Sequence, residues 1–240
     1  MTGFEQVVRD NIPTYYVVDL SQTSRVVTFN RNWRYQNQSS LPYAITFAIK
    51  YVNGYFYFSS NDYFYKTDSN FNLISNYNRF WASYRGIYYH SKSALFFVSP
   101  SSLNEIHVFD TNCGLQASIS TPNFKPYAIN NLHGNFYVGQ NVEDGRGQEP
   151  RMAVLKKDMI LRITSKWNIN CGTESRVVSI TFDSLGFMLV ACEATNKILL
   201  YDTNGNYLNS LQTLSTPYAT AIDHNGRLVI MTGNSLDIYY

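Results

Sequence analysis

The stretch PYATAIDHNGRLVIM at residues 217–231 decides the fold, because its pattern returns along the whole chain. It reads as a strand, a turn at Asp-His-Asn-Gly and a second, aliphatic strand. Short aromatic or aliphatic runs that match this second strand stand at positions 16, 56, 96, 136, 188 and 228, in steps of 40, 40, 40, 52 and 40. A fixed period of about 40 residues with strands in each unit is typical of a β-propeller with one blade per repeat.

Two more strands complete each unit. In the fifth unit they run over residues 197–202 and 207–211 and are joined by the turn Thr-Asn-Gly-Asn. A glycine that tolerates a positive φ precedes the second strand by two residues in four units, at Gly54, Gly134, Gly186 and Gly226. The sequence therefore predicts an all-β fold: one six-bladed β-propeller domain over residues 1–240, with four antiparallel strands in each blade.

The first strands share a Pro-Tyr-Ala motif at residues 42–44, 126–128 and 217–219, which the third unit replaces with Trp-Ala-Ser-Tyr at 81–84. Ring closure leaves alternatives open. Residues 5–8 read best as the first strand of the first unit, which leaves the last unit three strands long. They read alternatively as the outer strand of the last blade. In the first case the ring is closed by a borrowed strand, or the chain is a piece of a longer protein.

These motifs resemble the NHL-repeat propellers. Units of that family open the inner strand with proline and a small residue, follow it with an Asp-x-x-Gly hairpin, and read N-x-I-x-φ-φ-D in the third strand. The matching segments here are residues 217–240 together with 195–202, and residues 126–138. The histidine of the family's name is replaced by Lys197 and Glu105. The resemblance implies a ring of six blades, and some members of the family bind RNA.

Composition limits the functions to consider. The chain has 45% hydrophobic and 15% charged residues, and its net charge is +2. A charge this small predicts neither a nucleic-acid partner nor a membrane surface as partner. The cysteines Cys113, Cys171 and Cys192 show no C-x-x-C spacing, and we interpret them as isolated thiols. A disulfide between Cys171 and Cys192 is compatible with the pattern but not indicated by it.

The sequence predicts no catalytic residues, no metal and no cofactor. Three of the four histidines fall in expected hairpin turns and His107 falls inside a strand, without metal-binding spacing. The inner strands offer chiefly Asn130 and Asn131, which are weak metal ligands. An RNA-binding propeller and a propeller hydrolase or lyase with an unrecognised channel site remain alternatives.

One face of the ring is the predicted binding surface. It is formed by the loops between the second and third strands and by the loops between blades. The longest step marks an insertion at residues 140–151 on this face, and insertions tend to gather on the binding face. The candidate ligand-binding residues are Tyr43, Trp81, Tyr127, Arg146, Arg151, Trp167 and Tyr218. The aromatic members could instead pack between blades. We expect a monomeric, non-catalytic module that binds a protein, peptide or glycan.

Overall fold

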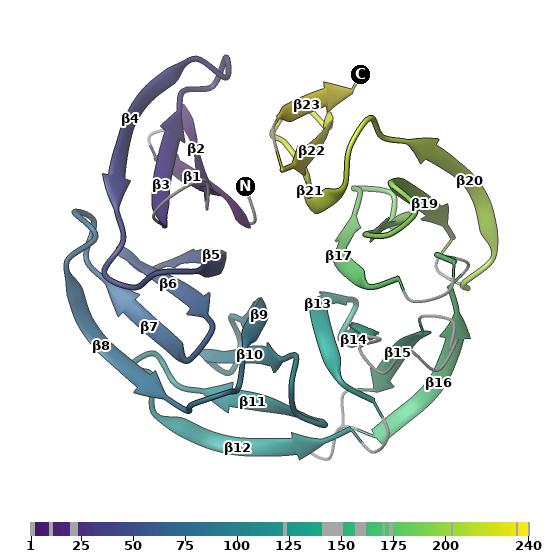
Figure 1. The fold of residues 1–240 in the computed structure, drawn as a ribbon, viewed down its shortest axis with the longest axis horizontal. Helices are drawn as coiled ribbons and strands as arrows, with labels where there is room; N and C mark the ends of the chain where they lie inside the picture. Colours follow the sequence, from purple (N-terminus) through teal and green to yellow (C-terminus); the bar gives the residue numbers. More distant parts are fainter. Residues whose placement is uncertain are drawn as a thin grey trace.

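The computed structural model describes residues 3–9, 12–19, 24–121, 124–140, 151–156, 162–169, 171–172, 175–202, 204–233 and 235–239. These residues form strands and turns arranged around a central opening (Figure 1). No helix capable of spanning a membrane occurs among them.

Each sheet follows the order of the chain, with its first strand innermost (Figure 1). The first sheet is β1 (Gly3–Arg9), β2 (Ile12–Asp19), β3 (Arg25–Phe29) and β4 (Tyr35–Ser40). The second is β5 (Thr46–Val52), β6 (Tyr55–Ser60), β7 (Tyr63–Thr67) and β8 (Leu73–Asn78). The third is β9 (Tyr84–His90), β10 (Leu95–Pro100), β11 (Glu105–Phe109) and β12 (Leu115–Ser120).

The other half of the ring repeats this arrangement. The fourth sheet is β13 (Pro126–Leu132), β14 (Asn135–Gln140), β15 (Arg151–Lys156) and β16 (Arg162–Asn168). The fifth is β17 (Val177–Phe182), β18 (Met188–Cys192), β19 (Lys197–Tyr201) and β20 (Tyr207–Gln212). The last sheet is β21 (Pro217–Ile222), β22 (Leu228–Thr232) and β23 (Leu236–Tyr239).

The prediction of an all-β propeller with four-stranded antiparallel blades is confirmed, but the number of complete blades differs. Five sheets have four strands, whereas the sheet of β21, β22 and β23 has three among the described residues. Residues 5–8 lie in β1, which pairs with β2 from Gly3 opposite Val18 to Arg9 opposite Ile12. These residues therefore open the first blade and do not complete the last sheet.

A recurring aspartate closes the hairpins. The Asp183 Oδ1 atom accepts hydrogen bonds from the backbone N–H groups of Leu185 and Phe187, at 2.9 and 2.8 Å. The same bonds, two and four residues ahead, are accepted by Asp68, Asp110, Asp202 and Asp223. A short carboxylate side chain can satisfy turn amides that have no strand partner, so the repeat of this residue is a repeat of turn chemistry.

The core lies between neighbouring blades and explains the aromatic composition. The Tyr57 ring of β6 lies 4.2 Å from the Phe96 ring of β10, centroid to centroid, and the Phe64 and Phe109 rings lie 4.6 Å apart. All four side chains are buried. Wedge-shaped gaps between twisted sheets need wide, rigid side chains, which Tyr and Phe provide.

Side chains of the first blade and the last sheet close the ring. Trp33, in the turn after β3, stacks on Tyr15 with centroids 4.0 Å apart, and its indole N–H donates to Asp223 Oδ2 at 3.3 Å. The Tyr15 hydroxyl forms a hydrogen bond with His224 Nδ1. An apolar cluster that includes Val17 and Met231 lies between the same sheets. Among the described residues, these side-chain contacts and the contact between the inner strands β1 and β21 join the two ends of the ring. No strand of the first blade pairs with the last sheet in this part of the chain.

Two cysteines form a disulfide that the sequence did not indicate. Cys171 is bonded to Cys192, with Cα atoms 5.3 Å apart and both side chains buried. The interpretation of these two residues as isolated thiols is wrong, because only the packing of the loop before β17 on the end of β18 brings them together. Cys113 is a free, buried thiol, and burial raises its pKa to about 11.

Candidate functional site

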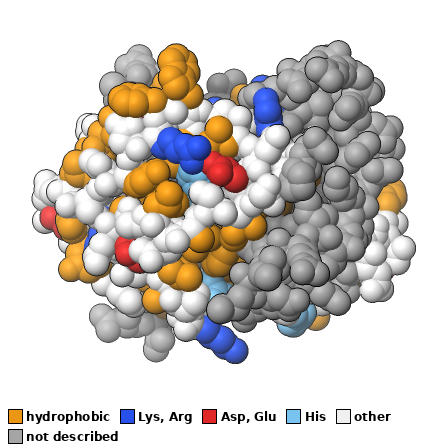
Figure 2. All heavy atoms as spheres, turned by 90° about the horizontal axis from the view of Figure 1, so that it is seen from below, with side chains coloured by type: hydrophobic (Ala, Val, Ile, Leu, Met, Phe, Trp, Pro, Cys, Tyr) orange, Lys and Arg blue, Asp and Glu red, His pale blue; other side chains and the backbone are white. Residues whose placement is uncertain are grey.

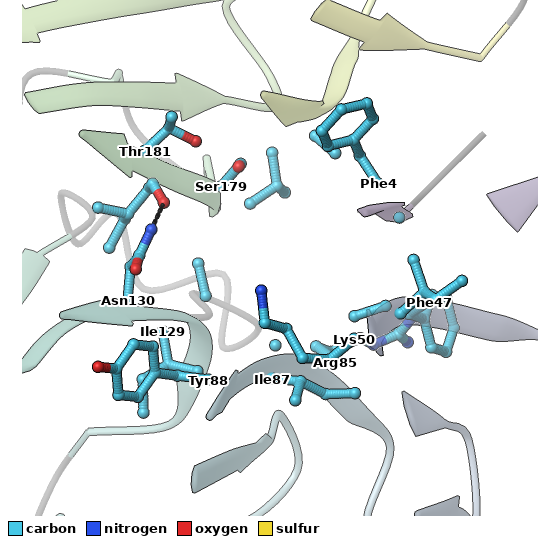
Figure 3. A pocket seen from close by; sticks show the side chains of 18 of the residues that line it. Phe4, Phe47, Lys50, Arg85, Ile87, Tyr88, Ile129, Asn130, Ser179 and Thr181 are labelled. Atoms are coloured by element: carbon cyan, nitrogen blue, oxygen red, sulfur yellow. Dashed lines mark hydrogen bonds between the residues drawn. The ribbon is translucent and has the colours of Figure 1, made fainter. Parts of the chain in front are cut away.

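A cavity of about 300 Å³ occupies the centre of the ring and is lined by residues of all six inner strands (Figure 3). The residues belong mainly to the first halves of these strands. From β5 onward, that end of each inner strand follows a loop between blades, which belongs to the face that the sequence predicts as the binding surface. Its volume is at the lower end of the range for small-molecule sites.

A β-bulge near the start of most inner strands aims a side chain at this cavity. The register of β5 with β6 shifts between Thr46 and Ala48, and Phe47 lies between them. Corresponding shifts place Val178 in β17 and Tyr218 in β21. All three residues line the cavity. Bulges commonly redirect side chains in this way, and an extra residue in one strand is not visible as a motif in the sequence.

The second blade departs from the alignment of the Pro-Tyr-Ala motifs, because β5 begins at Thr46, after its motif, whereas β13 and β21 begin at the proline. Tyr127 and Tyr218 are the second residues of β13 and β21 and line the cavity. Tyr43 precedes β5 and does not correspond to them; Phe47 holds their position instead. The Tyr43 ring stacks on Tyr63 with centroids 4.0 Å apart. Its hydroxyl accepts a hydrogen bond from Asn76 Nδ2 at 2.6 Å. Tyr43 therefore packs within its own blade.

Cations and aromatic rings alternate along one side of the cavity mouth. The Arg85 guanidinium carbon lies 3.4 Å from the Phe47 ring centroid and 5.5 Å from that of Tyr127. Arg176 approaches Tyr127 at 5.9 Å, and its Nε atom lies 3.4 Å from Glu193 Oε2. A guanidinium stacked on a ring is held in a fixed plane by dispersion and by attraction to the ring quadrupole.

An ion pair between a half-buried lysine and a buried carboxylate lies in the same cavity wall. Lys50 Nζ contacts Glu5 Oε2 at 3.0 Å, and the backbone N–H of Tyr51 donates to Glu5 Oε1 at 3.2 Å. The Glu5 residue is 8% exposed. Burial raises the pKa of Glu5, and the neighbouring Lys50 ammonium counteracts that rise. Both oxygens of the Glu5 carboxylate therefore have partners in β5.

Hydroxyl and amide groups lie on the opposite side of the cavity, away from Phe47, Lys50 and Arg85 (Figure 3). The hydroxyl oxygens of Thr181 and Thr220 are 2.9 Å apart, and that of Ser179 is 3.0 Å from Thr220 Oγ1. Asn130 donates its amide to the carbonyl of Ile180 at 2.8 Å. The cavity therefore has a cationic, aromatic side and a neutral, polar side.

Trp81 stands apart from the cavity, on the loop between the second and third blades. Its side chain is 86% exposed, and that of Phe80 is 72% exposed. Figure 2, which looks at the rim of the ring, shows hydrophobic side chains standing out at one edge. The Trp81 backbone is held on both sides: its N–H donates to Asp62 Oδ1 at 3.0 Å, and its carbonyl accepts from the Ser102 hydroxyl.

The remaining predicted residues lie on the insertion-bearing blade. Arg146 lies outside the described residues. Arg151 and Trp167 are in β15 and β16, where Arg151 pairs with Asn168 and Met152 with Trp167, and their side chains lie outside the described part. The structure thus brings Tyr127 and Tyr218 together at the cavity and leaves Trp81 on a separate loop.

Sequence reasoning missed Phe47, Arg85, Arg176 and the pair Glu5–Lys50. The sequence did contain a signal for one of them. Arg85, the second residue of β9, stands where the fourth and sixth units have their repeated tyrosine. A charged residue at a repeated aromatic position in an inner strand could have indicated the cavity. The pairing of Glu5 with Lys50 joins two blades, and nothing in their spacing indicates it.

A hydrogen-bond network around the buried His107 lies in the third blade and the loop that precedes it. His107, 0% exposed, contacts the Tyr84 hydroxyl through Nδ1 at 2.8 Å and Glu105 Oε1 through Nε2 at 2.7 Å. Arg79 Nη1 reaches the same Glu105 oxygen at 2.6 Å. Arg79 Nη1 also lies 2.8 Å from His107 Nε2, so both ring nitrogens of His107 have polar partners.

This network predicts a loss of stability in mild acid. Burial lowers the pKa of His107, although Glu105 acts in the opposite direction. A histidine with a lowered folded-state pKa contributes stability that is complete above its unfolded pKa of about 6.5 and is lost as pH falls below it. We expect the free energy of unfolding to fall between pH 7 and 5, by at most about 1.4 kcal/mol per pH unit from this group.

Urea unfolding at pH 7.5, 6.5 and 5.5 checks this expectation. The His107→Gln variant should lose part of the pH dependence in that window. A second loss belongs to Glu105: burial acts to raise its pKa, but its bonds to His107 and Arg79 lower it overall. Its contribution is complete above about pH 4.5 and is lost below that value. Identical pH profiles of the wild type and His107→Gln would contradict the assignment.

Comparison with known proteins identifies the fold. No family model and no curated protein matches the chain. The WD40 β-propeller domain of Doa1 is similar in structure, with a TM-score of 0.71 and 12% identity over 98% of this chain and 76% of that one. Virginiamycin B lyase from Staphylococcus aureus gives a TM-score of 0.69 and 14% identity over 99% and 83%. A streptogramin B lyase gives 0.68 and 12% over 98% and 82%. Likeness at these identities shows the propeller fold and not a shared function.

Proposed function

We propose that this propeller is a non-catalytic binding module that takes a protein, peptide or glycan partner on the face formed by the loops between the second and third strands and the loops between blades. The observation that supports this proposal is Trp81, a large apolar side chain 86% exposed on a loop held by hydrogen bonds from both neighbouring loops. Trp residues dominate many binding interfaces because they bury a large area with few rotatable bonds.

The anchoring of this loop matters as much as its exposure. Ala82 donates its N–H to the carbonyl of Arg79 at 3.2 Å, and Ser83 donates to Asn61 at 2.6 Å. Trp81 has a φ of 68°, which non-glycine residues seldom adopt. A loop fixed in such a conformation loses little entropy when a partner binds. Phe80 enlarges the same apolar surface.

Other loops between blades extend this surface around the ring. Ile45, before β5, is 46% exposed and has a φ of 57°, and Leu214, before β21, is 98% exposed. Tyr127 and Tyr218 line the central cavity. A partner covering the central opening could contact several of these side chains together, which favours a macromolecular or extended ligand.

Affinity purification from extracts of the native source tests this proposal. The wild type should retain a partner that the Trp81→Ala variant loses at unchanged melting temperature. Leu185→Ala is the matched control, because Leu185 is 80% exposed on a β17–β18 hairpin at the opposite face. A photoreactive residue at position 81 should crosslink directly to the partner. Equal retention by wild type and Trp81→Ala would contradict the proposal, and a crosslink only to RNA would favour the RNA-binding alternative.

The lyase alternative has its own test. Among the described residues, no three His, Cys, Asp or Glu side chains gather as a possible metal site. Two of the similar structures are lyases, so a channel site involving other residues stays open as an alternative. Bound Ca²⁺ or Zn²⁺ in stoichiometric amount in the purified protein would favour it over the binding module.

We also infer that β21, β22 and β23 form a sixth blade of the ring. The support is that this sheet contains the same first three strands, has Gly226 at a φ of 77° in its first hairpin, and lies beside both β17 and β1. The resemblance to NHL-repeat propellers stays a proposal at the level of the family.

A further inference from the structure

The outermost strand of the first blade contains an acceptor triplet for N-linked glycans. Residues 37–39 of β4 read Asn-Gln-Ser, and such a triplet is an asparagine followed two residues later by serine or threonine, with no proline between them. No other asparagine of the sequence stands in a triplet of this kind. β4 pairs with β3 and forms the outer edge of the first sheet (Figure 1). The triplet therefore lies at the rim of the ring.

The side chain of Asn37 is accessible and oriented. The residue is exposed and lies opposite Thr28 of β3. Its Oδ1 atom accepts a hydrogen bond from the backbone N–H of Gln38 at 2.8 Å. Its Nδ2 atom, to which a glycan is joined, makes no hydrogen bond to any described residue. Side chains two residues apart in a strand point to the same face, so Asn37 and Ser39 share one face of β4.

The disulfide between Cys171 and Cys192 supplies independent evidence about where this chain folds. Both residues are 0% exposed, so the bond is part of the folded interior. Disulfides form and persist in oxidising surroundings, such as the lumen of the endoplasmic reticulum and the outside of the cell. Acceptor triplets are used in the same surroundings, because N-linked glycans are attached to secreted chains. The free thiol of Cys113 is 3% exposed and is thereby protected from pairing with a second chain.

We propose that Asn37 carries an N-linked glycan, on a chain that folds in an oxidising compartment. The Nδ2 atom of Asn37 forms a bond to the anomeric carbon of the first sugar of a lipid-linked oligosaccharide pyrophosphate. The bond from that carbon to the pyrophosphate oxygen breaks, the lipid pyrophosphate leaves, and the amide nitrogen loses one proton to a base of the transferase. None of the described residues that line the central cavity belongs to β4, and Trp81 lies on a loop of other blades. The glycan site is therefore independent of the proposed function.

Mass spectrometry of the protein from its native source tests the proposal directly. Peptide N-glycosidase removes the glycan from the asparagine side chain and converts that residue to aspartate. The untreated protein should yield a glycopeptide that contains residue 37, and treatment should lower the mass of the intact protein and leave aspartate at this position. An unmodified Asn37 in the native protein would overturn the proposal. Free thiols at both Cys171 and Cys192 in that protein would overturn the assigned compartment, and the proposal with it.

Matched variants identify the modified residue. The full chain is directed by a signal peptide into the secretory pathway of cultured eukaryotic cells, and the secreted protein is compared by electrophoresis before and after the glycosidase. The wild type should carry a single glycan, which Asn37→Gln and Ser39→Ala should each abolish and Ser39→Thr should retain. Melting curves confirm that each variant is folded, and if one does not fold, the measurement on the native protein still decides.

Asn209→Gln is the control, because Asn209 holds in β20 the place that Asn37 holds in β4. Asn209 is exposed, and its Oδ1 atom accepts a hydrogen bond from the backbone N–H of Ser210 at 2.8 Å. It stands in no acceptor triplet, so this variant should keep the glycan. A wild type secreted without a glycan, a glycan that persists in Asn37→Gln, or equal loss of the glycan in Asn209→Gln would overturn the proposal.

Discussion

Replacing Trp33 with alanine is expected to lower the free energy of unfolding by about 2–3 kcal/mol, below the roughly 3–5 kcal/mol of a fully buried aromatic side chain because Trp33 is half-buried. The change removes a ring stacked on the fully buried Tyr15 and the indole N–H bonded to Asp223, whose side chain is 0% exposed. Asp223 keeps its two contacts with Arg227, so the loss arises mainly from the cavity left beside Tyr15.

The effect should be large because Trp33 joins the first blade to the last sheet. Trp81→Ala is the control: its side chain is 86% exposed, so the free energy of unfolding should change by less than about 0.5 kcal/mol. Urea unfolding of both variants measures the difference. Trp33→Phe keeps a ring on Tyr15 without the N–H donor and should fall between alanine and the wild type. Equal effects at Trp33 and Trp81 would show that this contact does not hold the ring together.

Removing the disulfide by the double change of Cys171 and Cys192 to alanine should lower the free energy of unfolding by about 3 kcal/mol. The bond closes a loop of 21 residues in sequence separation, and opening it lets the unfolded chain gain entropy. Both side chains also belong to the apolar cluster that includes Val190 and Met188, so their truncation loses packing as well.

Unfolding with and without a reducing agent gives an independent measurement for the wild type. The reductant should lower the wild-type transition and leave the double variant unchanged. Cys113 should not contribute to the change in the transition, because it is already a free thiol without reductant. A wild type whose transition is insensitive to reductant, with a double variant of equal stability, would contradict the contribution assigned to this bond.

Local chemistry made much of the fold predictable. The turns are closed by bonds between residues two and four apart, as at Asp183, and the glycines of the hairpins adopt a positive φ, as at Gly54, where it is 89°. The repeated aromatic and aliphatic runs lie in the second strands, because a pleated strand with both faces buried needs consecutive apolar residues. Such patterns are contained in a few neighbouring residues and repeat with the chain, so the sequence alone determines them.

The candidate site depended on contacts that no local pattern contains. The strand β5 begins at Thr46, after the Pro-Tyr-Ala motif at residues 42–44, so Tyr43 packs within its own blade and Phe47 lines the cavity. Arg85 lies between Phe47 and Tyr127 only because three blades meet at the axis. The disulfide likewise needs the loop before β17 to reach the end of β18. Residues far apart in sequence meet only after the sheets have packed, and their side-chain chemistry is therefore decided by the tertiary structure.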